Sequence, residues 1–447
     1  MHGFDFAGKR ILCASVSAIS LSLSLPVFAS MGNLGTTYGV MPSDIASAQA
    51  LSMFNTQVSA TYYNPAYLTK DPRGELTAGL LHAEQELRAS SPTRDGDVVS
   101  NSPSQHVLVG MKTNLGSLTR FGHPLYLGFV AGVEKYGKEM LAFESETSED
   151  GQFLQYGREP LFLNIGGATK IWRGIDAGVA ARITLQAEAS LDARSTLAGE
   201  TSQERLGVSA KPSIKGIASV NVDLGETICP EQACIVSGFE TALAYRARSN
   251  TKTTVDANVV VPQVIPEPGL PLAVSTIDSF QPEIIAFGLH YRGDGWRVGA
   301  SLEHQKWSEL EDVFANDTIK NQSGVSEGLR MSFDDILVPR IGGEYQLTRA
   351  FAVTAGVSYE ESPLRSTQNP EVNYFDNDKI VVGLGVSAEY ERTRLFAYAV
   401  RFDLGYQYQQ LQKRDFQVTP FGSETANETV ETDGDVHVVA GSVTFKF

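Results

Sequence analysis

Residues 175–191 read IDAGVAARITLQAEASL, and this stretch decides the fold class. From Ile175 to Leu191 every second residue is Ile, Ala, Val or Leu, while most residues between them are polar or small, with Arg182 and Glu188 among them. Alternation with a period of two is typical of a β-strand with two unlike faces. The stretch far exceeds the five or six residues of an average strand. Its length suits a tilted strand that crosses a bilayer with its apolar face toward lipid.

The same alternation recurs along the chain from residue 74 onward. Short connections such as 293–295 alternate with long ones such as 137–159, the pattern of bacterial outer-membrane barrels with short periplasmic turns and long external loops. We therefore predict an all-β protein, a 14-stranded antiparallel transmembrane β-barrel over residues 74–447. The expected strands lie near residues 75–88, 104–115, 124–136, 160–172, 174–192, 207–224, 238–249, 280–292, 296–309, 335–346, 350–360, 379–390, 394–411 and 436–447.

The C-terminus carries a further barrel signal. The chain ends in the alternating segment VTFKF, which closes on the aromatic residue Phe447. In barrels of this class a terminal Phe resembles the signal read by the barrel assembly machinery, so we expect Phe447 to contact that machinery. An even number of strands also places both ends of the barrel on the periplasmic side.

The N-terminus predicts export. Lys9 and Arg10 precede an apolar run over residues 11–25, and Val27 and Ala29 suit signal peptidase. The alternative is a membrane anchor, but the run is too short to span a bilayer. We expect residues 1–29 to be a signal peptide and the mature chain to start at Ser30.

Two cysteines remain after the signal peptide, Cys229 and Cys234, in the one long turn on the expected periplasmic side. An isolated pair in an exported protein indicates a disulfide. A metal site would need two further ligands, and no His lies nearby. We therefore expect a disulfide, and neither a metal nor a cofactor.

Composition excludes other classes. The chain has 447 residues, is 42% hydrophobic and carries a formal net charge of −16. An acidic chain without a basic run is a poor candidate for nucleic-acid binding. Beyond the N-terminus no apolar run approaches the ~18 residues of a membrane-spanning helix.

Residues 30–73 differ from the rest and form a separate segment. They are rich in Ala, Gly, Ser and Thr, and they predict one short helix over residues 43–54. The lumen of a 14-stranded barrel is wide enough to hold such a segment as a plug, or hatch. The segment contains Asn64-Pro65-Ala66, which by itself would indicate only a turn.

Together with its position, this tripeptide carries a family resemblance. Further matching motifs are Trp307-Ser308, the run PRIGGEY over residues 339–345, and Ser362-Pro363. Over essentially the whole mature chain, the sequence resembles the FadL family of outer-membrane transporters for long-chain fatty acids and other hydrophobic compounds. Tyr67 stands where that family usually has Gly after Asn-Pro-Ala, and residues 136–161 lack the usual aromatic-rich pattern.

The resemblance implies a monomeric barrel plugged by a hatch that contains Asn64, Pro65 and Ala66. A hydrophobic substrate would enter from an outer groove, pass an inner apolar site and leave sideways into the outer-membrane lipids at a kink in the third strand. Gly128 and Gly132 fall in that strand, and glycine permits a bulge or kink. They could equally be packed under the plug.

Several residues are candidates for contact with the ligand. Met53 and Phe54 could line the inner site or pack the plug against the wall. Strand parity places Arg182 and Arg340 inward, where each could meet a fatty-acid carboxylate or form an ion pair. Trp307 also has inward parity and could line the pocket. Residues 259–274 form an expected apolar external loop suited to first capture of a hydrophobic ligand.

Functions other than transport of fatty acids or similar molecules have weaker support in the sequence. Residues 324–328 read GVSEG and match G-x-S-x-G, a motif that works only on a strand-to-helix turn of an α/β hydrolase. A barrel lipase is therefore disfavoured, and a plug disfavours an open porin. Transport of aromatic hydrocarbons, export of oxidised fatty acids and adhesion through the loops stay open. We expect no enzymatic activity.

Overall fold

The computed structural model describes residues 33–92, 101, 103–116, 123–134, 161–195, 201–231, 234–261, 265–316, 319–320, 326–327, 332–365, 375–391, 397–418 and 428–447. Sixteen strands form one sheet, and fourteen of them close into a barrel because β4 pairs with β3 on one side and with β5 on the other. All ladders between barrel neighbours are antiparallel, which confirms the predicted 14-stranded barrel. The signal-peptide prediction lies outside the described residues.

Strand bounds follow the predicted segments closely, although β6, β17 and β18 extend further outward than expected. The barrel strands are β1 (Glu75–Ser90), β2 (Ser104–Asn114), β3 (Leu125–Glu134), β4 (Leu161–Trp172), β5 (Ile175–Ser195), β6 (Thr201–Asp223), β7 (Phe239–Arg246), β10 (Glu283–Arg292), β11 (Trp296–Lys306), β14 (Ile336–Gln346), β15 (Phe351–Glu360), β16 (Lys379–Tyr390), β17 (Ala399–Val418) and β18 (Glu428–Lys446).

The two faces of the wall differ as the alternation predicts. On β5, Val179 is 65% exposed while its near neighbour Arg182 is 1% exposed. On β17, Leu404 is 54% exposed and Asp403 is 4% exposed. Apolar residues therefore cover the outer, lipid-facing surface, and polar residues face the lumen.

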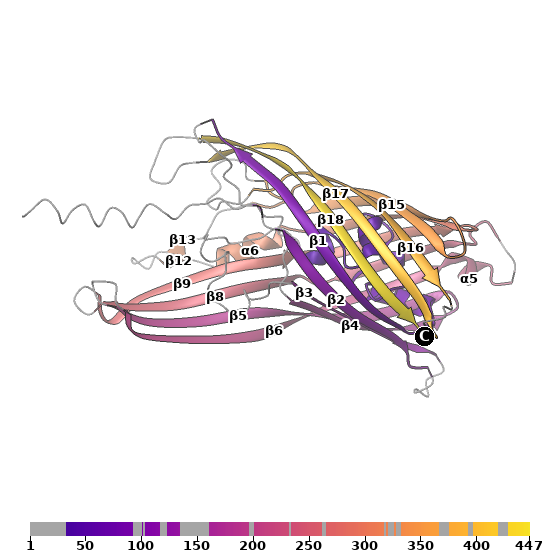
Figure 1. Ribbon diagram of the computed structural model, residues 1–447, viewed down its shortest axis with the longest axis horizontal. Helices are drawn as coiled ribbons and strands as arrows, with labels where there is room; N and C mark the ends of the chain where they lie inside the picture. Colours follow the sequence, from indigo (N-terminus) through magenta and orange to yellow (C-terminus); the bar gives the residue numbers. More distant parts are fainter. Residues whose placement is uncertain are drawn as a thin grey trace, which may run out of the picture.

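The hatch fills the lumen with short helical turns: α1 (Leu34–Thr37), α2 (Pro42–Ala46), η1 (Ser52–Phe54), α3 (Ala60–Tyr63) and η2 (Pro65–Lys70). Figure 1 shows these indigo elements inside the barrel. The predicted single helix over residues 43–54 is wrong, because Ala48 and Gln49 have positive φ and turn the chain. The turn brings the hatch backbone onto the wall: a Cβ on Gly356 would overlap the Ser47 carbonyl group. No helix among the described residues is long and apolar enough to cross a bilayer.

Polar groups of the wall hold the hatch by its backbone. Lys112 Nζ donates to the carbonyl oxygen of Thr56 at 2.6 Å, and Arg297 Nη1 donates to that of Phe54 at 3.0 Å. Gln409 Nε2 donates to the Thr37 carbonyl oxygen at 2.7 Å. These bonds satisfy buried carbonyl groups that the short helical turns leave open.

The region expected as a long external loop after β7 is a hairpin instead. Strands β8 (Ser249–Val261) and β9 (Ile265–Gln281) pair with each other, and β8 also pairs in parallel with β5 beyond the end of β4. In Figure 1, β5, β6, β8 and β9 leave the barrel together as one long sheet, which we call the blade. The sequence of β9 concealed this strand because it holds Pro266, Pro268 and Pro271.

The opposite end of the barrel carries the cysteine pair. Helix α5 (Leu224–Ile228) starts at Asp223, whose side chain accepts from Glu226 N at 2.9 Å. Cys229 and Cys234 follow and form the predicted disulfide, with 6.2 Å between their Cα atoms. The bond closes the turn between β6 and β7.

Candidate functional site

The Asn64-Pro65-Ala66 motif lies against the inner side of β5 and β6. Ala66 N donates a hydrogen bond of 2.8 Å to Ser219 Oγ on β6. On β5, a Cβ at Gly178 would overlap Ala66 N and the carbonyl carbon of Pro65, so only glycine allows this approach. Asn64 Nδ2 donates to the Met53 carbonyl oxygen at 2.7 Å and ties the motif to the rest of the hatch.

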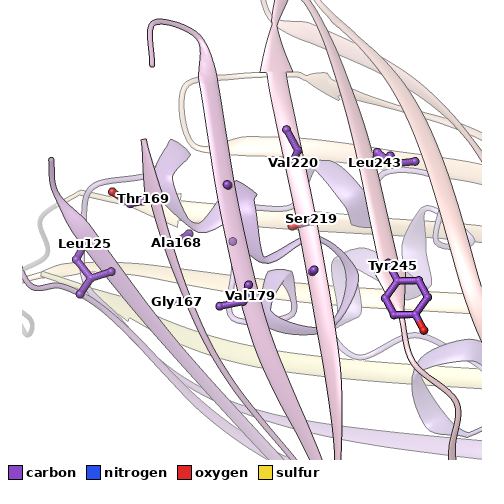
Figure 2. A pocket seen from close by; sticks show the side chains of 12 residues that line it. Leu125, Gly167, Ala168, Thr169, Val179, Ser219, Val220, Leu243 and Tyr245 are labelled. Atoms are coloured by element: carbon purple, nitrogen blue, oxygen red, sulfur yellow. The ribbon is translucent and has the colours of Figure 1, made fainter. Parts of the chain in front are cut away.

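The outer side of the same strands carries an apolar groove of about 580 Å³. Figure 2 shows its labelled residues on adjacent strands, with the hatch helices behind them. Its rim is formed by the large residues Leu125, Val179, Val220, Leu243 and Tyr245, which belong to β3, β5, β6 and β7. The volume is that of a typical small-ligand site.

The wall between the groove and the motif consists of small residues. Gly167, Ala177, Gly178 and Ala218 line the groove, together with the inward-facing Ser219 that binds Ala66. A hatch motif and an apolar groove therefore share one thin section of wall. Sequence reasoning missed Ser219 and Gly178, because small residues that meet across strands leave no motif.

A second outer groove, of about 790 Å³, lies over β11 and β14–β17. Its inner side is polar, because Arg297 and Glu344 form an ion pair of 2.9 Å there. This groove is larger, but a charged pair separates it from the lumen. The groove behind the hatch motif is thus the better candidate site.

Met53 and Phe54 pack the hatch against the wall. Both are buried, in one cluster with Tyr67 and with alanines of β7 and β10. The Phe54 ring stacks on His290 at a centroid distance of 4.8 Å. Met53 and Phe54 could line the inner site or pack the hatch against the wall. Their described contacts are packing contacts.

The inward arginines cluster beside the hatch. Arg340 Nη1 lies 3.0 Å from Glu303 Oε2, and Arg246 also pairs with Glu303. The Arg182 guanidinium lies over the rings of Tyr62, at 4.9 Å, and Phe162, at 5.4 Å. Sequence reasoning placed Arg182 and Arg340 inward correctly, but it missed Arg246, the last residue of β7.

The remaining predicted residues also have definite places. Trp307 is buried, and its Nε1 donates to Gln305 Oε1 at 2.9 Å. Phe447 is 53% exposed at the barrel end, where its backbone pairs with Gly74. Recognition of Phe447 by assembly machinery stays a prediction. Ser326 of the G-x-S-x-G match lies in the two-residue strand β13 (Ser326–Glu327), which pairs with β12 (Ile319–Lys320).

The two glycines of β3 are sites of close packing. A Cβ on Gly128 would overlap Thr61 of the hatch, and one on Gly132 would overlap Phe162 and Leu108. Between Leu125 and Glu134 the ladders to β2 and β4 run without a register shift. Gly128 thus packs under the hatch and Gly132 against side chains of the wall, and a lateral opening at these glycines stays a prediction. Among the described residues, no cluster of His, Cys, Asp or Glu could hold a metal ion.

A closed 14-stranded barrel with an apolar outer face and a hatch in its lumen defines an outer-membrane transport barrel. The chain belongs to the OMPP1/FadL/TodX family of outer membrane transport proteins, whose family model matches residues 239–447. It is 68% identical to Alkane uptake protein A from Marinobacter nauticus over 439 residues, which are 98% of this chain and 96% of that protein.

Solved structures share the fold at low identity. A Pseudomonas aeruginosa FadL homologue aligns with a TM-score of 0.59 and 13% identity over 91% of this chain and 98% of its own. The Pseudomonas putida toluene transporter TodX aligns with a TM-score of 0.55 and 14% identity, over 92% and 99%. Its family and its 68% identical relative make the protein an outer-membrane channel for hydrophobic compounds.

Proposed function

We propose that the protein mediates passive, hatch-gated uptake of long-chain alkanes across the outer membrane, with lateral release through the wall at the groove of β3–β7. One observation carries the proposal. Pro65 and Ala66 seal, from the inside, the thin section of wall whose outer side is the apolar groove. Displacement of the hatch motif from Gly178 and Ser219 would connect lumen and groove.

Elementary energetics favours a sideways route. Each methylene gains ~0.8 kcal/mol on leaving water, so a hydrocarbon chain is held back from an aqueous exit into the periplasm. A groove on the lipid-facing wall delivers the chain directly into the membrane. We therefore propose that the opening lies at β4–β6, one to three strands beyond the predicted position at β3. Leu125 of β3 is on the rim of the groove.

Alkanes are preferred over fatty acids as substrate for two reasons. The relative that is 68% identical is named for alkane uptake. Moreover, Arg340 and Arg246 pair with Glu303, and Arg182 and Arg246 lie over rings of the hatch, so the described contacts of these arginines are with the protein itself.

Fatty acids are the second candidate, on one specific observation. Among the described residues, two guanidinium groups, those of Arg246 and Arg340, pair with the same carboxylate, that of Glu303. An excess of cations would suit a carboxylate ligand. Competition between the two ligand classes separates the candidates.

The test is uptake of labelled hexadecane by cells that lack the chromosomal gene and carry either wild type or an empty vector. Wild type should restore uptake, and unlabelled hexadecane should compete better than oleate or toluene. Strong competition by oleate alone would favour the fatty-acid reading. Uptake equal to the empty vector at normal surface levels would refute hydrocarbon transport.

Because the wall has no open edge between its strands, we propose that one chain is the functional unit.

A further inference from the structure

We propose that only the second half of the hatch moves when the hatch opens, and that a row of glycines in the wall holds the first half in place. We call residues 33–57 the seated half. Residues 60–70, which contain α3 and η2, are the gate half. This inference deepens the proposed function and rests on it, because it states how the contact at Ser219 opens while the lumen stays plugged.

The row of glycines crosses four neighbouring strands of the wall. Gly299 of β11 pairs directly with Gly342 of β14. Gly342 pairs with Gly356 of β15, which in turn pairs with Gly383 of β16. Directly paired residues lie on the same face of a sheet. Glycine inside a strand often marks a site that another backbone approaches closely. We call this row the seat.

The seated half crosses the seat strand by strand. A Cβ added at each glycine of the seat would meet the hatch, and the hatch residues follow in chain order: Leu51 at β11, Ala50 at β14, Ser47 at β15 and Ile45 at β16. At Gly356 and Gly383 the obstructing atoms are carbonyl oxygens, so any side chain there would collide with the hatch backbone. The contact continues on β17, where a Cβ on Gly405 would overlap the Pro42 carbonyl oxygen.

The turn of the chain over the seat is itself unusual. Ala48 and Gln49 have φ values of 46° and 64°, a left-handed conformation that is uncommon for residues with a side chain. Such a conformation persists only where the surrounding structure fixes it. The seat supplies contacts on either side of the turn, and Gln49 Nε2 donates to the Thr36 carbonyl oxygen at 3.0 Å. The seated half is therefore held in one conformation.

Side chains of the wall add hydrogen bonds to the backbone of the seated half. Gln407 of β17 continues the row because it pairs with Gly383, and its Nε2 donates to the Tyr38 carbonyl oxygen at 3.1 Å. Other carbonyl oxygens of this half accept from Lys112, Arg297 and Gln409. Each bond that breaks would leave a buried carbonyl group unpaired, so the cost of moving the seated half rises with each of them.

The gate half has contacts that are easier to replace. Its backbone meets β6 at the hydrogen bond between Ala66 N and Ser219 Oγ. Tyr67 Oη accepts from Arg292 Nη2 at 3.1 Å, and the Arg292 side chain is 54% exposed, so water can take the place of this partner. Displacement of the gate half alone therefore leaves fewer buried groups unpaired than displacement of the whole hatch.

The location of the seat also distinguishes the two outer grooves. The seat lies on β11, β14, β15 and β16, and these strands carry the second groove on their outer side. A seated half that stays in place keeps this part of the wall covered from inside. Movement of the gate half uncovers the wall at Gly178 and Ser219 instead. The route from the lumen then leads to the groove behind the hatch motif.

The experiment compares two engineered disulfides in cells that lack the chromosomal gene, in a background without the native cysteine pair. The seat lock is Ala50→Cys with Gly342→Cys. A Cβ on Gly342 would lie 3.0 Å from that of Ala50, close to the ~3.5–4.5 Å that separates the Cβ atoms of a disulfide. The gate lock is Ala66→Cys with Ser219→Cys. Uptake of labelled hexadecane is measured on oxidised cells at equal surface level, with the crosslink quantified, and again after reduction.

Oxidation should leave uptake through the seat lock within about twofold of that through the reduced protein, and it should lower uptake through the gate lock at least about tenfold. Loss of uptake in the oxidised seat lock, restored by reduction, would overturn the proposal, because the whole hatch would then have to move. Unchanged uptake through the oxidised gate lock would refute gating at Ser219, and with it the proposed function itself.

Hydrogen exchange gives a second measurement that needs no substitution at the seat. Ser219→Ala loosens the contact of the gate half. Exchange in this variant should rise in residues 60–70 and keep the wild-type rate in residues 42–51, because the two halves open separately. A parallel rise in both segments would overturn the proposal, since it would show that the hatch moves as one body.

Discussion

The backbone amide of Ala66 donates a 2.8 Å hydrogen bond to Ser219 Oγ, and this bond joins the hatch motif to the barrel wall. Both residues are buried, Ala66 completely. The outer side of the same wall section is the apolar groove. This bond therefore belongs to the closed state of the proposed gate.

Ser219→Ala should loosen the gate. The variant leaves a buried amide without its acceptor, which costs about 1–3 kcal/mol. We expect faster hydrogen exchange in residues 60–70 and a severalfold rise in hexadecane uptake. Ser209→Ala, an exposed position on the same strand, is the control and should change neither. Unchanged exchange in Ser219→Ala would show that the bond does not hold the hatch.

Gly178→Ala should destabilise the seated hatch, because the added Cβ overlaps Pro65 and Ala66. We expect a loss of about 1–3 kcal/mol, measured as a lower thermal midpoint in detergent. The matched control is Gly216→Ala on β6, where a Cβ would meet no atom within 4 Å. Similar midpoints for the two variants would argue against close packing at Gly178.

Glu303→Gln should be strongly destabilising, because it leaves Arg246 and Arg340 buried without their carboxylate. Breaking a buried pair costs about 3–5 kcal/mol. Glu84→Gln removes an exposed partner of His82 and should cost less than ~1 kcal/mol. Chemical denaturation in detergent compares the two variants. A stable Glu303→Gln protein would show that the arginines have other partners in the lumen.

Asp376 should give the fold a pH dependence. It lies in the connection before β16, and burial raises the pKa of its carboxyl group from 3.8 to about 6, although Lys379 and Ser362 favour the charged form. The folded state then holds a proton that the unfolded state releases, so the contribution of Asp376 to stability should fall as pH rises from about 4 to 6.

Asp376→Asn keeps an acceptor for Ser362 Oγ, which now donates at 2.9 Å. The variant should remove the contribution of Asp376 to the pH dependence and stabilise the protein at pH 7 by at most ~3 kcal/mol. Thermal midpoints between pH 4 and pH 8 test this. The midpoint of Asp376→Asn minus that of wild type should grow from pH 4 to pH 6, and a difference that shrinks over this range would contradict the assigned sign.

The barrel could be predicted from sequence because period-two alternation is set by the lipid on one side and the lumen on the other. The hatch could be predicted because about forty residues ahead of the barrel lack that alternation. Ser219 and Gly178 could not be found in this way, because contact between distant strands and the hatch depends on register. The blade was hidden for two reasons: its prolines suggested a loop, and the parallel pairing of β8 with β5 has no local signal.

Locking the hatch tests the central claim most directly. In a Cys229→Ser, Cys234→Ser background, Ala66→Cys and Ser219→Cys place one thiol on each of the two residues that the 2.8 Å hydrogen bond joins. Hexadecane uptake is measured on oxidised cells, with the crosslink quantified on a gel, and again after reduction. We predict that crosslinked protein does not restore uptake and that reduction recovers it. Wild-type uptake through the crosslinked protein would contradict a gate at the Asn64-Pro65-Ala66 motif.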